Sequence, residues 1–365
     1  MYHVTRAHIN MKALRDNYRL IRSHVDKTDK NAEIICVVKA DGYGHGAGRC
    51  SSVFKREGAR NFAVSNLDEA IEVRRAVGDG AMILILGYTD PAYVDDLVKN
   101  GITQTVFSEK YARALSKNLK GKLNVHIKID TGMNRLGFSS DEEGIDAAAR
   151  CARLPGLHAD GIFTHFADAD EADEEPTRRQ FERFMHAIKT LEGSGFSFRM
   201  RHCCNSAATV RFPDMYLNAV RCGIILYGLN PSDCSSLSGL TPVMSLHSRI
   251  VHIHEVHPGE RISYGGTFSP CKPVKVATVP IGYDDGLLRS YASEGFYING
   301  KYAKILGRIC MDQCMVDITD IDCREGDNVE IFGSHQSVDT FARAASTINY
   351  EVTCMVGKRV PRDEV

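Results

Sequence analysis

Short apolar runs alternate with amphipathic stretches between residues 33 and 227, and this alternation constrains the fold more than any other feature of the sequence. The first run, residues 34–38, is apolar throughout, which is typical of a strand buried on both faces of a parallel sheet. The pattern predicts an α/β fold with a (β/α)8 TIM barrel, and an open doubly wound sheet is the competing architecture. The expected strands are residues 33–39, 61–65, 82–87, 103–107, 124–129, 160–164, 198–202 and 223–227.

The character of the sequence changes after residue 227. Residues 230–239 are rich in serine, proline, aspartate and glycine, which is typical of a linker. Beyond them the apolar runs are short and strand-like, with one helix expected at 338–348, and Asn299-Gly300 between two runs predicts a two-residue hairpin turn. The sequence therefore predicts a barrel domain over residues 8–230 and a C-terminal, mostly-β domain over residues 240–365 that also takes residues 1–7.

Composition narrows the functional classes. A net charge of −1 over 365 residues gives no reason to expect nucleic acid or an anionic membrane as a partner. With no signal peptide and no run long enough to span a bilayer, a cytoplasmic location and free thiols are expected for the twelve cysteines. His252 and His254 could share one face of a strand, but structural zinc normally takes four ligands, so no metal site is predicted.

Reactive side chains recur where the expected strands end, and a barrel gathers its catalytic groups at the carboxyl ends of its strands. A lysine that is partly desolvated there loses its proton more easily and could form a Schiff base with an aldehyde, whereas the alternative for Lys39 is an ordinary rim residue. Any one of these residues could be structural, but their recurrence indicates a site. They are Lys39, Lys128, His165, His202 and Arg221.

The region of the last two expected strands resembles a phosphate site. Asn205-Ser206 begins a helix after the seventh strand, and Gly223 lies near the eighth. Backbone N–H groups and a serine hydroxyl at such places bind phosphate, although a helix cap and a packing glycine explain the same residues. The glycines at 42, 44, 46 and 48 match neither a dinucleotide-binding fingerprint nor a P-loop.

The segment VVKADGYGHG around Lys39 resembles the pyridoxal-phosphate lysine motif of the alanine racemase family, which are fold-type III enzymes, although that family usually has alanine in place of Gly42. The resemblance extends from ALRDNYRL to YEVTCMVGKRVPR and includes SYG and CMDQ segments. It implies pyridoxal 5'-phosphate as the cofactor, carried by Lys39.

The resemblance also assigns the other cofactor contacts. Arg221 would face the pyridine nitrogen and His202 would hydrogen-bond this arginine. Because a guanidinium can only donate, the ring nitrogen would keep no proton of its own and the cofactor would be a weaker electron sink. The implied cofactor-binding residues are Lys39, Tyr43, His165, His202, Asn205, Ser206, Arg221, Gly223, Ile224 and Tyr350.

Racemisation needs a base on each face of the α-carbon. The resemblance implies that Lys39 serves one face and that Tyr264, in ISYGGTF, serves the other. A tyrosine is a poor base unless its pKa is lowered, and His165 matches the neighbour expected to help, with Arg289 or Arg308 also possible.

The implied substrate contacts are the backbone N–H of Met311 and the side chain of Arg135, which would both bind the substrate carboxylate, and Tyr283 at the entrance. Lys128 matches a lysine that is often carbamylated in relatives, which would let it orient Arg135. Asp284 is a departure, because the family more often has alanine there.

These family sites are composite. Tyr264, Tyr283 and Met311 would come from the partner subunit of a head-to-tail homodimer, so a monomer would be inactive. The expected function is interconversion of L- and D-alanine, which supplies a D-amino acid for peptidoglycan precursors.

Three alternatives remain at this stage. The first is a serine or serine/alanine racemase of the vancomycin-resistance type, suggested by the short tail ending at Val365, by Asp284 and by Asn349; the chain would then be the catalytic half of a membrane protein. The second is a fold-related decarboxylase, against which Arg221 argues because a glutamate is expected at that place. The third is a non-catalytic cofactor carrier, which would lack the second domain.

Overall fold

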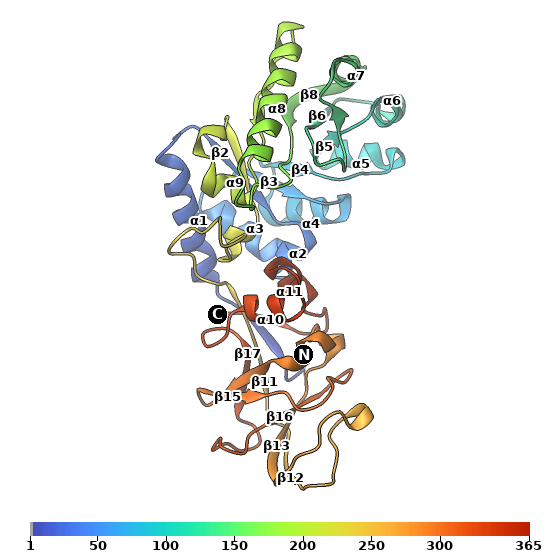
Figure 1. The fold of residues 1–365 in the computed structure, drawn as a ribbon. Coiled ribbons are helices and arrows are strands. Elements are labelled where there is room, and N and C mark those ends of the chain that lie inside the picture. Colours follow the sequence, from blue (N-terminus) through green and yellow to red (C-terminus); the bar gives the residue numbers. More distant parts are fainter. Residues whose placement is uncertain (1–2) are drawn as a thin grey trace. The chain divides into compact units, whose positions relative to one another are not determined.

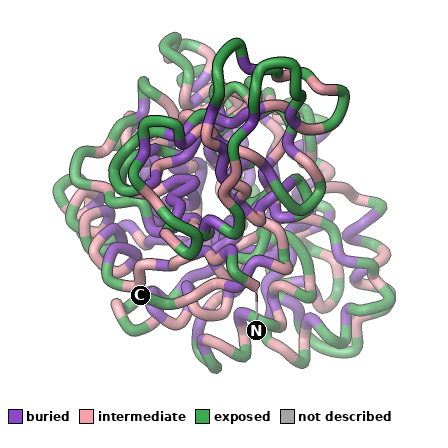
Figure 2. The backbone as a smooth tube through the Cα atoms, turned by 90° about the horizontal axis from the view of Figure 1, so that it is seen from below, coloured by how far each residue is buried: buried purple, intermediate pink, exposed green. Residues whose placement is uncertain are grey.

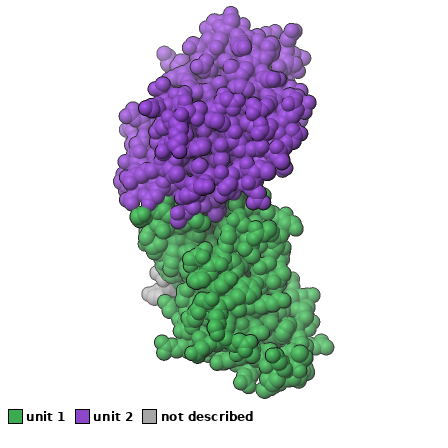
Figure 3. All heavy atoms as spheres, turned by 60° about the vertical axis from the view of Figure 1, so that its left-hand side comes forward, with its two compact units in different colours: residues 1–13, 43–45, 242–365 green, residues 14–42, 46–241 purple. Residues whose placement is uncertain are grey.

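The computed structural model describes residues 3–365, which divide into two compact units (Figure 3). The barrel unit holds residues 14–42 and 46–241, and the C-terminal unit holds residues up to 13, residues 43–45 and residues 242–365. Residues 43–45, which the sequence places in the barrel domain, therefore cluster with the C-terminal unit. Residues 1–2 of the expected C-terminal domain lie outside the described residues.

Eight parallel strands form a closed barrel in the barrel unit (Figure 1). The barrel is closed, because its last strand pairs with its first strand, with Val220 opposite Ile34. The barrel is thus confirmed and the open sheet is excluded. The strands are β2 (Glu33–Val37), β3 (Asn61–Val64), β4 (Met82–Ile85), β5 (Thr103–Val106), β6 (Leu123–Asp130), β8 (Leu157–Phe163), β9 (Met200–His202) and β10 (Ala219–Cys222), and the short β7 (Phe138–Ser139) pairs with β6.

Some helices of the barrel unit begin at a side chain that caps them. Asn66 and Ser108 accept hydrogen bonds from the backbone N–H groups of Glu69 and Tyr111, as their sequence contexts predict.

Buried positions gather inside and exposed positions on the outer loops (Figure 2). The helices of this part of the chain are α1 (Met11–Asp26), α2 (Lys39–Tyr43), α3 (Ala47–Arg56), α4 (Leu67–Val77), η1 (Pro91–Tyr93), α5 (Val94–Lys99), α6 (Glu109–Asn118), α7 (Glu142–Ala152), α8 (Glu175–Gly193), α9 (Ser206–Arg211), η2 (Pro213–Met215) and η3 (Ile224–Tyr227).

The expected eighth strand at residues 223–227 is wrong. The strand is β10 and ends at Cys222, and residues 224–227 form the 3₁₀ turn η3, which ends at Gly228 with φ of 79°. All four residues of this turn are fully buried, so their apolar run carries no periodicity that separates a strand from a buried turn. Arg221 consequently lies inside the strand rather than before it.

The C-terminal unit is mostly sheet. A six-stranded sheet has the order β15-β14-β17-β11-β1-β18, and a three-stranded sheet has the order β12-β13-β16. The predicted hairpin is confirmed, since Asn299 and Gly300, with φ of 49° and 76°, join two of its strands. The strands are β1 (Arg6–Ile9), β11 (Met244–Arg249), β12 (His252–Val256), β13 (Val274–Val279), β14 (Gly295–Ile298), β15 (Lys301–Lys304), β16 (Cys314–Asp317), β17 (Asn328–Phe332) and β18 (Arg362–Glu364).

The helix expected at 338–348 is present as α10 (Val338–Ala344), which begins where expected but ends four residues early. A separate short helix, α11 (Asn349–Met355), follows it, and Ser346 between the two helices has a φ of 53°, which a continuous helix does not allow. The same unit has three 3₁₀ turns, η4 (Tyr264–Gly266), η5 (Tyr283–Asp285) and η6 (Arg289–Ser293).

No helix among residues 3–365 is both long and apolar enough to cross a membrane. Within the same residues no cluster of His, Cys, Asp and Glu side chains could hold a metal ion, although the rings of His252 and His254 do stack at 5.1 Å. The twelve cysteines are free thiols.

Candidate functional site

Lys39 lies directly after β2 and begins a left-handed turn. Ala40, Asp41 and Gly42 have φ values of 53°, 52° and 60°. A left-handed backbone costs non-glycine residues about 1–2 kcal/mol each, so this turn persists only because its surroundings hold it. Strain of this kind is concentrated at functional sites.

Glu69 of α4 is one of the groups that hold this turn. Its carboxylate accepts hydrogen bonds from the backbone N–H of Ala40 at 2.8 Å and of Ser65 at 2.7 Å. The N–H of Gly42 closes the turn on the carbonyl of Val38 at 2.9 Å. The peptide that follows Lys39 is therefore fixed by a carboxylate from a neighbouring helix. Glu69 was not among the residues predicted from the sequence.

Arg221 of β10 is a buried cation held by several acceptors. Its side chain donates to His202 Nδ1 at 2.8 Å and to the carbonyls of Cys203 and Thr164 at 2.8 and 2.9 Å, and it also contacts His165 Nδ1 at 3.2 Å. Burial lowers the pKa of Arg221 to about 10, so the guanidinium still carries its charge at neutral pH. A fixed donor with no acceptor capacity thus lies at the end of the barrel where Lys39 begins its turn.

A chain of histidines extends from Arg221. Because Arg221 donates to Nδ1 of His202, that ring carries its proton on Nε2 and donates to Nδ1 of His126 at 3.0 Å. Burial lowers the pKa of both rings, that of His126 to about 4, so both are neutral as this chain requires. The ring of His126 also explains why residue 161 is a glycine, because an added Cβ there would lie 2.5 Å from Nε2 of His126.

His126 was not among the residues predicted from the sequence, although its position on the strand is a signal that could have identified it. His126 and Lys128 are two residues apart on β6 and therefore share one face of that strand. Since Lys128 was a candidate, the alternation pointed to His126 as well.

Lys128 is almost fully buried in the barrel. Its ammonium group donates to the carbonyl of Ile129 at 2.9 Å and lies 5.4 Å from the ring centre of Phe163. Burial, with smaller effects of Arg221 and Arg135, lowers the pKa of Lys128 to about 7. A large fraction of this amine is therefore unprotonated and nucleophilic at neutral pH.

His165 and Arg135 are the remaining polar groups at this end of the barrel. Burial, followed by the charges of Arg221 and Lys128, lowers the pKa of His165 well below its usual range. Arg135 is exposed on the loop after β6, where its backbone N–H donates to Asp130 at 3.1 Å. The positive charges of the two arginines, Arg221 and Arg135, both contribute to lowering the pKa values of Lys128 and His165. These four side chains therefore lie near one another.

Ser206, Gly223 and Ile224 form a small cradle beside them. The N–H of Gly223 donates to Oγ of Ser206 at 2.8 Å, and Ile224 begins η3 directly afterwards. The side chain of Asn205 caps α9 by accepting from the N–H of Ala208 at 2.9 Å, which gives it a structural role here. The cradle combines a buried hydroxyl with backbone donors, as an anion requires.

The C-terminal unit brings the remaining candidates together in two groups. Tyr43 and Tyr350 have ring centres 5.9 Å apart, and burial raises the pKa of Tyr43. Tyr264 and Met311 line one open cavity of about 520 Å³. Tyr283 adjoins this cavity, because its N–H donates to the carbonyl of Cys310, another lining residue, at 3.1 Å.

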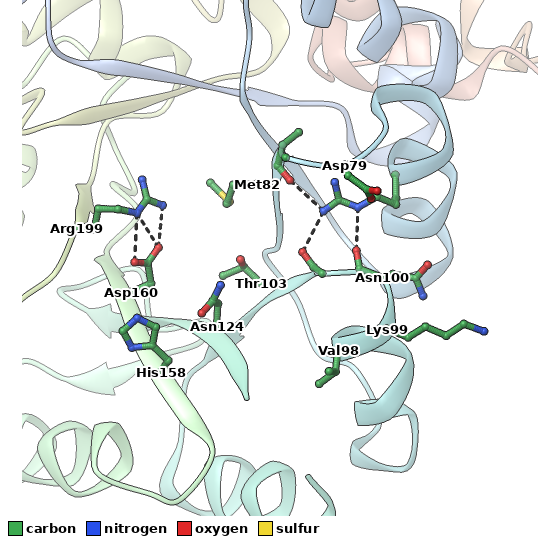
Figure 4. A pocket seen from close by; sticks show the side chains of 14 residues that line it. Asp79, Met82, Val98, Lys99, Asn100, Thr103, Asn124, His158, Asp160 and Arg199 are labelled. Carbon is green, nitrogen blue, oxygen red and sulfur yellow. Dashed lines mark hydrogen bonds and ion pairs between the residues drawn. The ribbon is translucent and has the colours of Figure 1, made fainter. Parts of the chain in front are cut away.

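Another cavity, of about 540 Å³, lies at the amino ends of the barrel strands (Figure 4). Its charged side chains are engaged in structural contacts. Arg199 pairs with Asp160 at 2.8 Å, and Arg74 donates to the backbone carbonyls of Asn100 and Gly101 at 2.8 and 3.0 Å. This end of a barrel usually serves stability, and these contacts agree with that role.

Comparison with known proteins covers both units. Residues 9–231 match the family model "Alanine racemase, N-terminal domain" and residues 243–364 match "Alanine racemase, C-terminal domain". The chain is 45% identical to alanine racemases of Desulforamulus reducens and Desulfovibrio desulfuricans, over 98% of this chain and 97% and 96% of those proteins.

Solved structures give the same result. The alanine racemase of Clostridium difficile 630 superposes with a TM-score of 0.95 at 39% identity, covering 100% of this chain and 96% of that one. The alanine racemase of Bacillus anthracis with bound L-Ala-P superposes with a TM-score of 0.94 at 32% identity, with the same coverage.

Proposed function

The chain belongs to the alanine racemase family and interconverts L- and D-alanine, and we propose that it does so with pyridoxal 5'-phosphate at Lys39 and with Tyr264 as the second base. The observation that carries the cofactor proposal is the buried guanidinium of Arg221, kept in place by the histidine chain and by backbone carbonyls. This is a donor suited to the unprotonated ring nitrogen of the cofactor. It also argues against the decarboxylase alternative, for which a glutamate is expected.

The residues present fit this cofactor. The amine of Lys39 would hold its aldehyde, Ser206 and the backbone at Gly223 and Ile224 would hold its phosphate, and Arg221 would face its ring nitrogen. When bound, the cofactor withdraws electron density from the α-carbon of the substrate, so the α-proton becomes acidic. We place Tyr43 and Tyr350, whose rings pack together, at the phosphate as well.

The chain's own groups would move the proton. Lys39 and Tyr264 would lie on opposite faces of the α-carbon, one without its proton to remove the α-proton and the other with a proton to return, so that the centre inverts. His165 is neutral and contacts Arg221, so it can hydrogen-bond without adding charge to the site. Arg135, Tyr283 and the N–H of Met311 would bind and orient the substrate.

A head-to-tail homodimer with composite sites is part of this proposal. Tyr264, Met311 and Tyr283 have 69%, 52% and 41% of their surface exposed in the single chain. Large apolar side chains exposed together around one cavity are typical of surfaces that a partner covers. We propose that each subunit supplies these three residues to the other.

The serine racemase alternative gains no support from the residues that suggested it. Asn349 is buried and donates to Asp339 at 2.8 Å, and Asp284 pairs with Arg359 at 2.7 Å, so both have structural partners. We expect kcat/KM for L-alanine to exceed that for L-serine by at least about tenfold, since a small apolar pocket discriminates by roughly this factor. Racemisation of both amino acids by one preparation with added cofactor tests this, and equal or faster reaction of serine would overturn the alanine assignment.

Carbamylation of Lys128 is a separate proposal. With a pKa of about 7, its amine becomes increasingly unprotonated as the pH rises from 6 to 8, and the free amine adds to CO₂ with loss of one proton. The carbamate would carry a negative charge with which to hold Arg135. We therefore expect the carbamate signal in ¹³C NMR with ¹³CO₂ to grow over this range.

A matched variant completes this test. Lys128→Met keeps an unbranched side chain of nearly the same length in this buried position but has no amine, so it should show no such signal. A wild-type protein without the signal at pH 8 would exclude the modification, and so would an equal signal in the variant.

A further inference from the structure

Arg359 of the C-terminal unit contacts three carboxylates at once. Its Nη1 lies 2.7 Å from Asp284, its Nε lies 2.7 Å from Asp285, and its Nη2 lies 2.7 Å from Asp312 and 3.1 Å from Asp285. These hydrogen bonds, led by those to Asp285 and Asp312, raise the pKa of Arg359, so it stays charged. One planar cation therefore joins two chain segments that are far apart in sequence.

The two segments are also packed backbone against backbone. The N–H of Asp284 donates to the carbonyl of Met311 at 3.1 Å, directly beside the bond from Tyr283 to Cys310. An added Cβ at Gly282 would lie 2.2 Å from the carbonyl oxygen of Met311, so only glycine allows this approach. The arginine thus closes over a contact between the segment of Tyr283 and the segment of Met311.

The three carboxylates differ in what they contribute. Asp285 has 1% of its side chain exposed and also accepts from the N–H of Gly282 at 2.9 Å, so its pair with Arg359 is structural. Asp284 and Asp312 have 56% and 60% of their side chains exposed. In the single chain, ion pairs this exposed add little to folding stability, so the stability of one subunit does not account for Asp284.

We propose that Asp284 is a positioning residue, which orients the guanidinium of Arg359 and thereby fixes the Tyr283 segment against the residue that follows Met311. This rests on the proposed function, in which Tyr283 and Met311 contact the substrate. Nη1 faces Asp284, while Nε and Nη2 face the other two carboxylates, so the guanidinium plane is held on both edges. Without Asp284, one edge of the Arg359 guanidinium would have no partner and its plane could turn. The substrate contacts of Tyr283 and Met311 would then loosen, while the reacting atoms would keep their positions.

The test begins with a series at position 284 in the cofactor-loaded enzyme. Asp284→Ala should raise KM for L-alanine about two- to fivefold, the range expected from an exposed ion pair, while kcat stays within about twofold. Asp284→Glu should restore KM. Asp284→Asn should lie between, because its amide oxygen still accepts from Arg359. Asp320→Ala, at an exposed turn of the same unit, is the control and should leave KM unchanged.

A second background separates positioning from a simple effect of charge. Arg359→Lys keeps the cation but loses the planar fork, so adding Asp284→Ala to it should change KM no further. An unchanged KM in Asp284→Ala, an equal rise in both backgrounds, or an Asn variant identical to Ala would each overturn the proposal. If Arg359→Lys does not fold, the series at position 284 decides. Absence of racemisation by the wild-type holoenzyme would instead overturn the proposed function itself.

Discussion

Replacing Lys39 with alanine is expected to lower kcat for alanine racemisation by at least about 10⁴-fold, because the change removes two proposed roles at once. The amine would both anchor the cofactor and serve one face of the α-carbon. Chiral chromatography of the product, starting from either enantiomer, measures the loss. Borohydride reduction followed by peptide mass analysis should find the cofactor attached to the peptide that contains Lys39 in the wild type and no attachment in the variant.

The fold should survive this change. The left-handed turn is held by main-chain bonds to Glu69 and Val38, and both bonds remain in the variant, so the unfolding midpoint should stay close to that of the wild type. Lys110→Ala removes an exposed lysine of α6 that has no role in the proposed function, and it should keep full activity. Unaltered racemisation by a folded Lys39→Ala variant would end the assignment of this residue.

The architecture was predictable because a closed barrel repeats one local pattern. Strands such as β3 are buried throughout and are followed by amphipathic helices such as α4, so the repeat is visible without knowledge of the contacts. The eighth strand was misplaced because residues 219–227 are buried without a break. In such a segment only tertiary pairing, here of β10 with β2, decides where the strand ends.

The site was predictable only for groups that a strand end or a motif exposes. Lys39 and His165 follow strands and His202 ends one, so their positions can be predicted from the pattern. Glu69 could not be found in this way, because Asn66 and Glu69 have the spacing of a capping box, and yet the carboxylate turns outward to the N–H groups of Ser65 and Ala40.

The role of Arg359 could not be predicted from the sequence for a related reason. Its role depends on Asp284, Asp285 and Asp312, and only the folded C-terminal unit places these residues around one guanidinium. A sequence shows that an arginine is present but not how many carboxylates it meets.

Replacing Tyr264 with phenylalanine is expected to reduce racemisation by about 10³-fold in both directions while leaving part of the chemistry intact. Only the hydroxyl is lost, from a side chain with 69% of its surface exposed, so the fold is not at risk. Lys39 would still remove and return a proton on its own face. In deuterated water, one enantiomer of alanine should therefore exchange its α-hydrogen without inversion, whereas the other should exchange slowly.

Proton NMR of each enantiomer, combined with chiral analysis of the same samples, distinguishes this from weaker roles of Tyr264. If Tyr264 only positioned the cofactor or substrate, its loss would slow exchange of both enantiomers equally. Either enantiomer must be bound correctly before its α-hydrogen can exchange. Tyr302→Phe, at an exposed tyrosine on β15 of the same unit, is the matched control and should exchange and racemise normally. Exchange confined to one enantiomer requires that each face of the α-carbon has its own base, which is the property that a two-base racemase must have and that a single-base enzyme lacks.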